Sequence, residues 1–195
     1  MTRYFSSLDD PEVVQLIHMG AIGVIPTDTV YGLVAAATNP NAVAKLYATK
    51  LRELPPGTMI GASVTDFAEL GFPADTLQKV KHLWPASLSI VLDASNIPPY
   101  LKQQRADLPV RIPAQPALAH LLRQTGPLMT TSANAPKQPT STTVAMAKEY
   151  FGESIDFYVD GGDLSGRPPS TIIGITPDDG IKIFRQGAAD VPSSL

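Results

Sequence analysis

The chain of 195 residues contains no cysteine. This absence excludes disulfide bonds, a thiolate nucleophile and a zinc site built on cysteine. Apolar runs are also short, because none approaches the roughly 20 residues that a membrane-spanning helix needs. The first residues, Met1–Phe5, lack the long apolar region of a secretory signal. We therefore expect a cytoplasmic protein that does not insert into a membrane.

Basic residues are not in excess either. Lysine and arginine number 15 against 18 aspartate and glutamate, which gives a net charge of −3 at pH 7. Proteins that coat nucleic acid have a basic balance, so the composition argues against that class. It leaves room for a local basic pocket that binds a phosphate.

Familiar catalytic motifs are absent from the sequence as well. It contains neither a GxxxxGK[ST] phosphate loop nor the GxSxG turn of a serine hydrolase. The histidines His18, His82 and His120 fall on predicted helices without the spacing of metal ligands. We therefore assign them to the surface or to contacts between helices, and we expect no metal site made by protein side chains.

The sequence does contain enough apolar residues for a core, 44% against 17% charged, in a length typical of one domain. Periodicity and turn residues predict helices at 11–19, from Asn39-Pro40 onward, after a cap at Thr65, at 75–84, around 117–122 and at 142–151. Strands are predicted at 21–26, 58–63, 88–92, 108–112, 127–131, 155–159, 170–175 and 180–185. This mostly alternating order predicts one α/β domain over residues 1–195, with an open, twisted, mixed sheet flanked by helices.

The most informative stretch is Pro26-Thr27-Asp28-Thr29-Val30-Tyr31-Gly32-Leu33, which follows the apolar run Ala21–Ile25. It places two hydroxyls, a carboxylate and a phenol directly after a buried strand, where open α/β sheets bind ligands. The alternative is a polar turn in which Asp28 and Thr29 cap their own backbone.

Two cationic groups fall at the ends of predicted elements. Lys50 and Arg52 follow a helix, where they could grip an anion or simply complement the helix dipole. Arg111 lies within the apolar strand Pro109–Pro113, so its guanidinium needs either a protein carboxylate or a ligand carboxylate as partner.

A dense set of hydroxyl groups follows the strand predicted at 127–131. It comprises Thr130-Thr131-Ser132-Ala133-Asn134 and Thr140-Ser141-Thr142, of which Ser141 or Thr142 is expected to cap the next helix. Ser170-Thr171 and Arg185 lie at later strand boundaries. Cations and hydroxyls without an evident nucleophile suit a site that binds a phosphate and a small zwitterion and joins them by positioning and charge stabilisation.

With these residues in view, the chain resembles the YrdC-like family, specifically the L-threonylcarbamoyl-adenylate synthases of the TsaC type. Eight motifs match in family order from about residue 10 to about residue 190: Pro26–Leu33, Lys50-Leu51-Arg52, Leu83-Trp84-Pro85, Val110–Pro113, Thr131–Asn134, Asp160-Gly161-Gly162, Pro169–Ile173 and Arg185-Gln186-Gly187. The match is to the short form, which lacks an additional C-terminal domain.

The resemblance implies a deep, concave, positively lined cavity and an enzyme that makes threonylcarbamoyl-AMP and pyrophosphate from L-threonine, bicarbonate and ATP. By analogy, Mg²⁺ bridges phosphate oxygens, and the product is passed to a separate complex that modifies tRNA. The residues implied to hold threonine are Thr29, Arg111, Thr130 and Ser170. Those implied to hold ATP are Lys50, Arg52, Ser132, Asn134, Thr140 and Arg185, with Lys50, Arg52 and Arg185 also offsetting developing charge.

The sequence departs from the family pattern after Arg52, where Glu53–Thr58 replaces the usual Lys or Asn followed by Pro-Leu. It departs again at Gly61–Ser63, where many relatives carry a polar residue, and at Ala135-Pro136, which replaces Ser-Gly. These changes keep a second hypothesis open: a YrdC-like paralogue that binds nucleotide or double-stranded RNA without forming the adenylate. Weak RNA binding also remains open for the enzyme itself.

Overall fold

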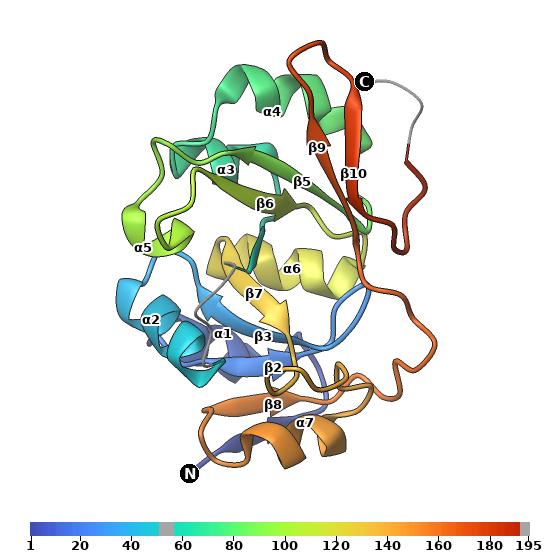
Figure 1. The fold of residues 1–195 in the computed structure, drawn as a ribbon. Coiled ribbons are helices and arrows are strands. Elements are labelled where there is room, and N and C mark those ends of the chain that lie inside the picture. Colours follow the sequence, from blue (N-terminus) through green and yellow to red (C-terminus); the bar gives the residue numbers. More distant parts are fainter. Residues whose placement is uncertain (51–56, 192–195) are drawn as a thin grey trace.

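The computed structural model describes residues 1–50 and 57–191, and within them all strands join one sheet (Figure 1). The spatial order of the ten strands is β1-β8-β2-β3-β7-β4-β6-β5-β9-β10. Their bounds are β1 (Arg3–Phe5), β2 (Gly23–Ile25), β3 (Gly32–Ala36), β4 (Thr58–Ile60), β5 (Leu88–Asp93), β6 (Asp107–Arg111), β7 (Leu128–Ser132), β8 (Phe157–Val159), β9 (Thr171–Ile175) and β10 (Ile181–Arg185).

The sheet is mixed. β8 runs parallel to both β1 and β2, β4 parallel to β6, and β5 parallel to β9, whereas the remaining neighbours are antiparallel. The expectation of an open, twisted, mixed sheet flanked by helices is confirmed.

Seven α-helices and one 3₁₀ helix of the described chain accompany this sheet. They are α1 (Pro11–His18), α2 (Pro40–Thr49), α3 (Val64–Glu69), α4 (Ala74–Val80), η1 (Lys81–Leu83), α5 (Pro99–Lys102), α6 (Pro116–Thr125) and α7 (Val144–Phe151). No helix in residues 1–50 and 57–191 has both the length and the apolar character to span a membrane.

Each central strand buries both faces, and alternate residues enter two different cores. Val24 belongs to the core that contains residues of α2 and α7, while the adjacent Ile25 belongs to the core that contains residues of α1 and α6. The same alternation separates Met129 from Leu128 in β7. The polar residues Arg111, Ser132 and Ser170 lie at the end of a strand or directly beside one.

The first two long helices begin where turn chemistry predicted. Asp10 Oδ1 accepts a hydrogen bond of 2.9 Å from the Glu12 amide at the start of α1. Asn39 Oδ1 accepts from the Asn41 and Ala42 amides at the start of α2. In both helices proline follows the cap, where its missing amide hydrogen costs no intrahelical bond.

Several element predictions were wrong. The cap of α3 is Ser63 rather than Thr65, because Asp66 reaches back to the Ser63 amide in a capping box. The cap of α7 is Thr143 rather than Ser141 or Thr142, because the Thr143 hydroxyl accepts from the Met146 amide. The helix predicted at 75–84 ends as α4 at Val80 and continues as η1.

Three elements were not predicted as such. β1 and α5 are short, and β1 exists through parallel pairing with β8, which local sequence does not encode. β3 was not among the predicted strands, and it pairs with both β2 and β7. It therefore carries the Thr27–Tyr31 turn into the centre of the sheet.

Candidate active site

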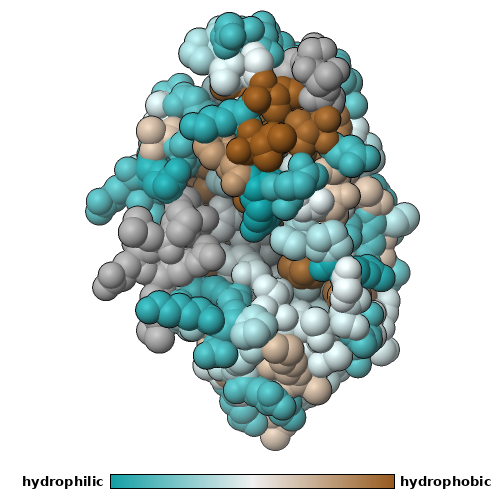
Figure 2. All heavy atoms as spheres, turned by 45° about the vertical axis from the view of Figure 1, so that its right-hand side comes forward, coloured by the Kyte–Doolittle hydropathy of each residue, from teal (hydrophilic) through white to brown (hydrophobic). Residues whose placement is uncertain are grey.

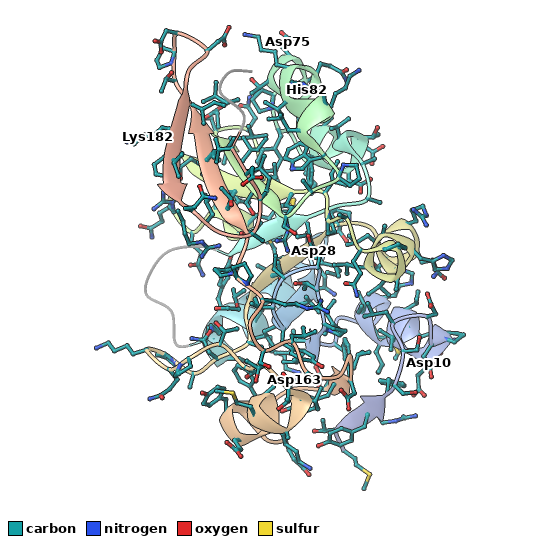
Figure 3. All side chains as sticks on the ribbon, turned by 90° about the vertical axis from the view of Figure 1, so that its right-hand side faces the viewer. Asp10, Asp28, Asp75, His82, Asp163 and Lys182 are labelled. Carbon is teal, nitrogen blue, oxygen red and sulfur yellow. The ribbon has the colours of Figure 1, made fainter. Side chains whose placement is uncertain are left out.

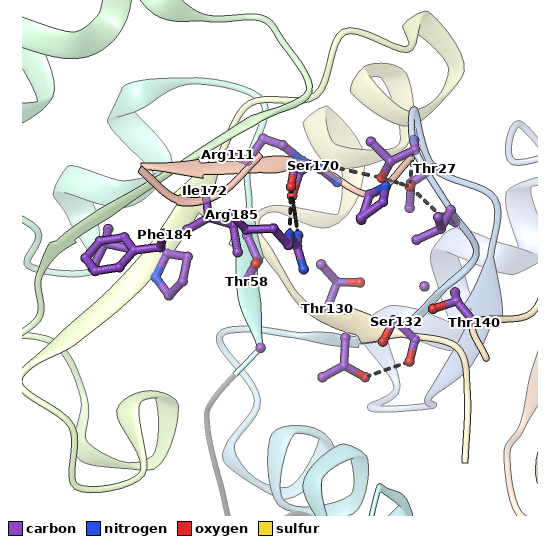
Figure 4. A pocket seen from close by; sticks show the side chains of 18 of the residues that line it. Thr27, Thr58, Arg111, Thr130, Ser132, Thr140, Ser170, Ile172, Phe184 and Arg185 are labelled. Carbon is purple, nitrogen blue, oxygen red and sulfur yellow. Dashed lines mark hydrogen bonds between the residues drawn. The ribbon is translucent and has the colours of Figure 1, made fainter. Parts of the chain in front are cut away.

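A cavity of about 450 Å³ opens between the turn that joins β2 to β3 and the ends of the strands β4 to β7, β9 and β10 (Figure 4). Its size is that of a small-molecule site. Its lining includes seven of the residues singled out from sequence, which come from segments far apart in the chain: Thr29, Arg111, Thr130, Ser132, Thr140, Ser170 and Arg185.

Thr27 organises the turn at one wall of the cavity. Its hydroxyl donates to the Val30 carbonyl at 2.6 Å and accepts from the Thr29 amide at 3.1 Å. Thr27, rather than Asp28 or Thr29, therefore caps this turn. The side chains of Asp28 and Thr29 are left to interact across the sheet.

Asp28 and Arg111 form a buried ion pair, with 3.2 Å between Arg111 Nη2 and Asp28 Oδ1. Ser87 donates a second contact of 2.8 Å to Asp28 Oδ2. Figure 3 shows Asp28 near the middle of the molecule, whereas Asp10, Asp75 and Lys182 lie nearer its edges. The partner of Arg111 that the sequence left open is thus a protein carboxylate on one side.

The remaining nitrogen atoms of the Arg111 guanidinium, Nη1 and Nε, have weaker partners or none among the described residues. Its Nη1 lies 3.4 Å from the Thr29 hydroxyl, and its buried Nε has no hydrogen-bond partner among the described residues. Burial lowers the pKa of this guanidinium, the Asp28 carboxylate raises it, and Arg185 lowers it again. Arginine nevertheless keeps its charge, so a cavity wall holds a cation with an unused donor.

Ser170 holds the second cation of the cavity, Arg185. Arg185 donates from Nε and Nη2 to the Ser170 carbonyl at 3.0 and 2.8 Å, and from Nη2 to the Ser170 hydroxyl at 3.2 Å. The Ser170 and Ser89 hydroxyls lie 3.0 Å apart. Backbone and side-chain contacts therefore fix the Arg185 fork at the edge of the cavity.

Lys50 lies behind the cavity wall and does not line it. Its side chain is 3% exposed, and its Nζ donates to the Ser132 carbonyl at 2.8 Å and to Asn134 at both the carbonyl and Oδ1. Asn134 Oδ1 also accepts 2.6 Å from the Ser132 hydroxyl. These bonds tie the end of α2 to the loop after β7. The alternative that Lys50 is a solvated residue at the helix terminus is therefore wrong.

Arg52 and most of the altered loop, residues 53–56, lie outside the described residues.

Tyr31, which lines the cavity, holds the loop of the Asp160-Gly161-Gly162 motif in place. Its hydroxyl donates to the Gly162 carbonyl and accepts from the Gly161 amide, both at 2.8 Å. Burial is the main cause that raises the pKa of this phenol. Gly32, next in sequence, lets Thr130 approach, since a Cβ on Gly32 would stand 2.6 Å from Thr130 Oγ1.

The cavity also contains residues that sequence reasoning did not select, namely Val91, Arg105, Asp107, Pro109, Ile172 and Phe184. A signal for some of them existed, because Asp107, Pro109 and Arg111 alternate along β6 and so share one face of the sheet. Arg105 is held by Asp107 through Nε and Nη2 at 2.9 and 2.6 Å. With Arg111 and Arg185 it makes the lining predominantly positive.

The histidines lie where they were assigned. All three are exposed, and His18 of α1 contacts the Gln124 carbonyl of α6 at 3.1 Å. Within residues 1–50 and 57–191, no three His, Asp or Glu side chains come together as metal ligands would. A divalent cation in this cavity would therefore depend on oxygen atoms of a ligand.

The fold and cavity define a class: an α/β protein with one open mixed sheet and a cavity at the ends of its strands, lined by arginine and hydroxyl side chains. The chain belongs to the Sua5/YciO/YrdC family, described as telomere recombination, whose match covers residues 15–187. A threonylcarbamoyl-AMP synthase of Pseudoalteromonas translucida is 31% identical over 166 residues, covering 82% of this chain and 89% of that protein. The resemblance stated from the motifs is confirmed.

Solved structures of this family have the same fold as this chain. Sua5 of P. abyssi in complex with L-threonine is 26% identical and superposes with a TM-score of 0.81, covering 96% of this chain and 57% of that chain. This chain thus spans less than two thirds of the Sua5 protein. YciO of E. coli, 24% identical with a TM-score of 0.82, is covered completely and shows the same fold.

Proposed function

We propose that this protein is a threonylcarbamoyl-AMP synthase, which forms threonylcarbamoyl-AMP and pyrophosphate from L-threonine, bicarbonate and ATP. The observation that carries the proposal is Arg111, a buried cation on the cavity wall whose Nε lacks a hydrogen-bond partner among the described residues. Relatives named for this activity and a Sua5 structure complexed with L-threonine support it.

The amino-acid end of the site centres on Arg111. Its guanidinium offers donors in a planar fork that matches a carboxylate. The Thr29 and Ser170 hydroxyls and Thr130 flank it as partners for the ammonium and hydroxyl groups of threonine. Since Asp28 already fixes Arg111, little ordering remains to oppose binding of the carboxylate.

The phosphate end lies on the other side of Arg185. Ser132 and Thr140 provide hydroxyl donors there, and Arg185 provides the charge that offsets negative charge on the α-phosphate and on the leaving pyrophosphate. Lys50 and Asn134 act by holding the loop that carries Ser132. Mg²⁺ would enter with ATP, held by phosphate oxygens, as is usual for this ion.

In the reaction, the deprotonated threonine nitrogen attacks the carbon of bicarbonate and forms a carbamate. The new C–N bond replaces a C–O bond of bicarbonate, whose oxygen leaves as water together with a proton from the nitrogen. A carbamate oxygen then attacks the α-phosphorus of ATP, and the bond from that phosphorus to the oxygen of the β-phosphate breaks as pyrophosphate leaves. Both nucleophiles belong to the substrates, so the protein needs to position them and stabilise charge. The product would then pass to a transferase complex that modifies tRNA.

Pyrophosphate release by the purified protein tests this proposal, with ATP present and L-threonine or bicarbonate omitted in turn. Release that requires both supports the synthase. ATP binding without threonine-dependent release would overturn it and favour the paralogue that binds nucleotide without forming an adenylate. A salt-dependent affinity for double-stranded RNA tighter than about micromolar would strengthen that second reading.

A further inference from the structure

Ser89 is a hydroxyl residue that lies behind the wall of the cavity. It belongs to β5, which stands between β6 and β9 in the sheet, and its side chain has no exposed surface. Its Oγ lies 3.0 Å from the Oγ of Ser170. Ser170 lines the cavity, whereas Ser89 is not part of the lining. Ser89 therefore contacts a cavity residue from behind without reaching a ligand itself.

Ser170 lies directly before β9 and faces the charged part of the cavity. Figure 2 shows hydrophobic residues gathered in the upper half of the molecule, where β9 and β10 come forward, and paler, weakly polar residues below them. In Figure 4, dashed lines join Ser170 to the Arg185 guanidinium. The Ser170 hydroxyl thus has two neighbours, Arg185 on one side and Ser89 on the other.

Counting donors and acceptors assigns the hydrogen atoms around the Ser170 hydroxyl. Arginine only donates, so Ser170 Oγ accepts from Arg185 Nη2 at 3.2 Å. In residues 1–50 and 57–191, the Ser89 hydroxyl has no partner other than Ser170 Oγ. If Ser170 donated to Ser89, the hydrogen of the fully buried Ser89 hydroxyl would have no acceptor, which is costly. Ser89 therefore donates to Ser170.

This arrangement determines what Ser170 offers to a ligand. A hydroxyl oxygen has two acceptor lone pairs and one hydrogen, and here Arg185 and Ser89 occupy both lone pairs. We propose that Ser89 is a positioning residue, which fixes the Ser170 hydroxyl as a hydrogen-bond donor to an oxygen of the amino-acid substrate. This assignment rests on the proposed function and extends it.

The assignment limits which group of threonine Ser170 contacts. The ammonium group has hydrogens but no lone pair, so it cannot accept a hydrogen bond, and Ser170 has no lone pair left to accept one from it. The carboxylate and the side-chain hydroxyl both have acceptor oxygens. Ser170 therefore donates to one of these two groups, and the ammonium group binds elsewhere.

Calorimetric titration with L-threonine tests whether Ser89 acts through Ser170. Ser89→Ala should weaken threonine binding about threefold to tenfold, the effect of one neutral hydrogen bond, and leave ATP binding near wild type. Adding Ser89→Ala to Ser170→Ala should cause no further loss, because Ser89 then has no hydroxyl to orient. Ser89→Thr keeps the donor and should restore the affinity of wild type.

Thr125→Val is the matched control. It also removes a buried hydroxyl, but this one donates to the Leu121 carbonyl of α6 and is not part of the cavity lining. Any general effect of losing a buried hydroxyl should appear in both variants. Thr125→Val should therefore bind threonine as wild type does.

Two analogues of threonine test whether Ser170 donates. L-2-aminobutyrate lacks the side-chain hydroxyl and (R)-1-amino-2-propanol lacks the carboxylate, while both keep the ammonium group. The loss caused by Ser89→Ala should disappear with the analogue that lacks the oxygen bound by Ser170 and persist with the other. An equal loss with both analogues would mean that Ser170 accepts from the ammonium group, and it would overturn the assignment.

Additive losses in the double variant, or wild-type affinity for threonine in Ser89→Ala, would also overturn the role of Ser89. In each of these cases, threonine-dependent release of pyrophosphate by wild type would leave the proposed function standing. If wild type binds no threonine, the proposed function fails and the role of Ser89 falls with it.

Discussion

Arg111 Nη2 lies 3.2 Å from Asp28 Oδ1, and the two side chains are 5% and 6% exposed. The two residues come from β6 and from the turn between β2 and β3, which are far apart in sequence. Removing both charges from water is expensive, and the opposite charges of the pair offset that cost while Ser87 donates a hydrogen bond to the carboxylate. The arrangement holds a cation at a cavity wall in one orientation.

Replacing Arg111 by lysine keeps the charge beside Asp28 but removes the planar fork. We expect the KM for L-threonine to rise at least about tenfold, the cost of one charge-assisted hydrogen bond, while the KM for ATP changes little. Steady-state kinetics with each substrate varied in turn measure the split. Arg123→Lys, on the exposed surface of α6, is the control and should match wild type. An unchanged threonine KM in Arg111→Lys would contradict the role given to Arg111.

Replacing Asp28 by asparagine leaves a group of the same shape but without charge. The buried guanidinium of Arg111 then loses its compensating charge, which we expect to cost roughly 3 kcal/mol of the free energy of unfolding. Urea denaturation measures this change. Asp10→Asn changes a carboxylate that caps α1, and asparagine caps equally well, so that variant should keep wild-type stability. Equal stability of the two variants would show that the Asp28–Arg111 pair contributes nothing.

Lys50→Met tests whether Lys50 acts through the loop that it holds. Losing its bonds to Ser132 and Asn134 should raise the KM for ATP several-fold and leave the KM for threonine near wild type. Asn134→Ala removes one of the same bonds and should shift the ATP KM in the same direction. A strong effect of Lys50→Met together with none from Asn134→Ala would instead indicate direct contact between Lys50 and ATP.

Tyr31→Phe removes the hydroxyl that joins Gly161 and Gly162 to the motif. Two hydrogen bonds are lost, so we expect a destabilisation of about 2 kcal/mol in thermal or urea unfolding. The pKa of Tyr31 is raised in the folded protein above its ordinary value of 10.0. The Tyr31 hydroxyl therefore contributes fully to the free energy of unfolding below pH 10.0, and this contribution declines as the pH rises toward the pKa of the folded state. The difference in the free energy of unfolding between wild type and Tyr31→Phe should therefore become smaller above pH 10.0. A gap that widens there would contradict the buried, neutral phenol.

Local sequence was enough to predict the polar residues that the cavity brings together. Thr29, Arg111, Ser132 and Ser170 all border apolar strands, and strand ends meet at the edge of a sheet. The caps of α1 and α2 were predictable for the same reason, because Asp and Asn before proline bond to nearby amides. Both kinds of prediction depend on a few neighbouring residues.

What the sequence could not provide depends on pairing between distant segments. The Asp28–Arg111 contact requires β6 to lie beside the β2–β3 turn, and the position of Phe184 requires a bulge relative to β9. Lys50 illustrates the same limit, since its placement behind the wall follows from the loop after β7 that receives it. Tertiary contacts, rather than residue type, decided these roles.

The central claim is that this cavity joins threonine, bicarbonate and ATP. The most direct measurement is mass spectrometry of the products after incubation of the protein with ATP, L-threonine and ¹³C-bicarbonate. The account predicts threonylcarbamoyl-AMP that carries the label, formed only with all three substrates and strongly reduced in Arg111→Lys. Unlabelled AMP, or no adenylate at all from protein that still binds ATP, would contradict it.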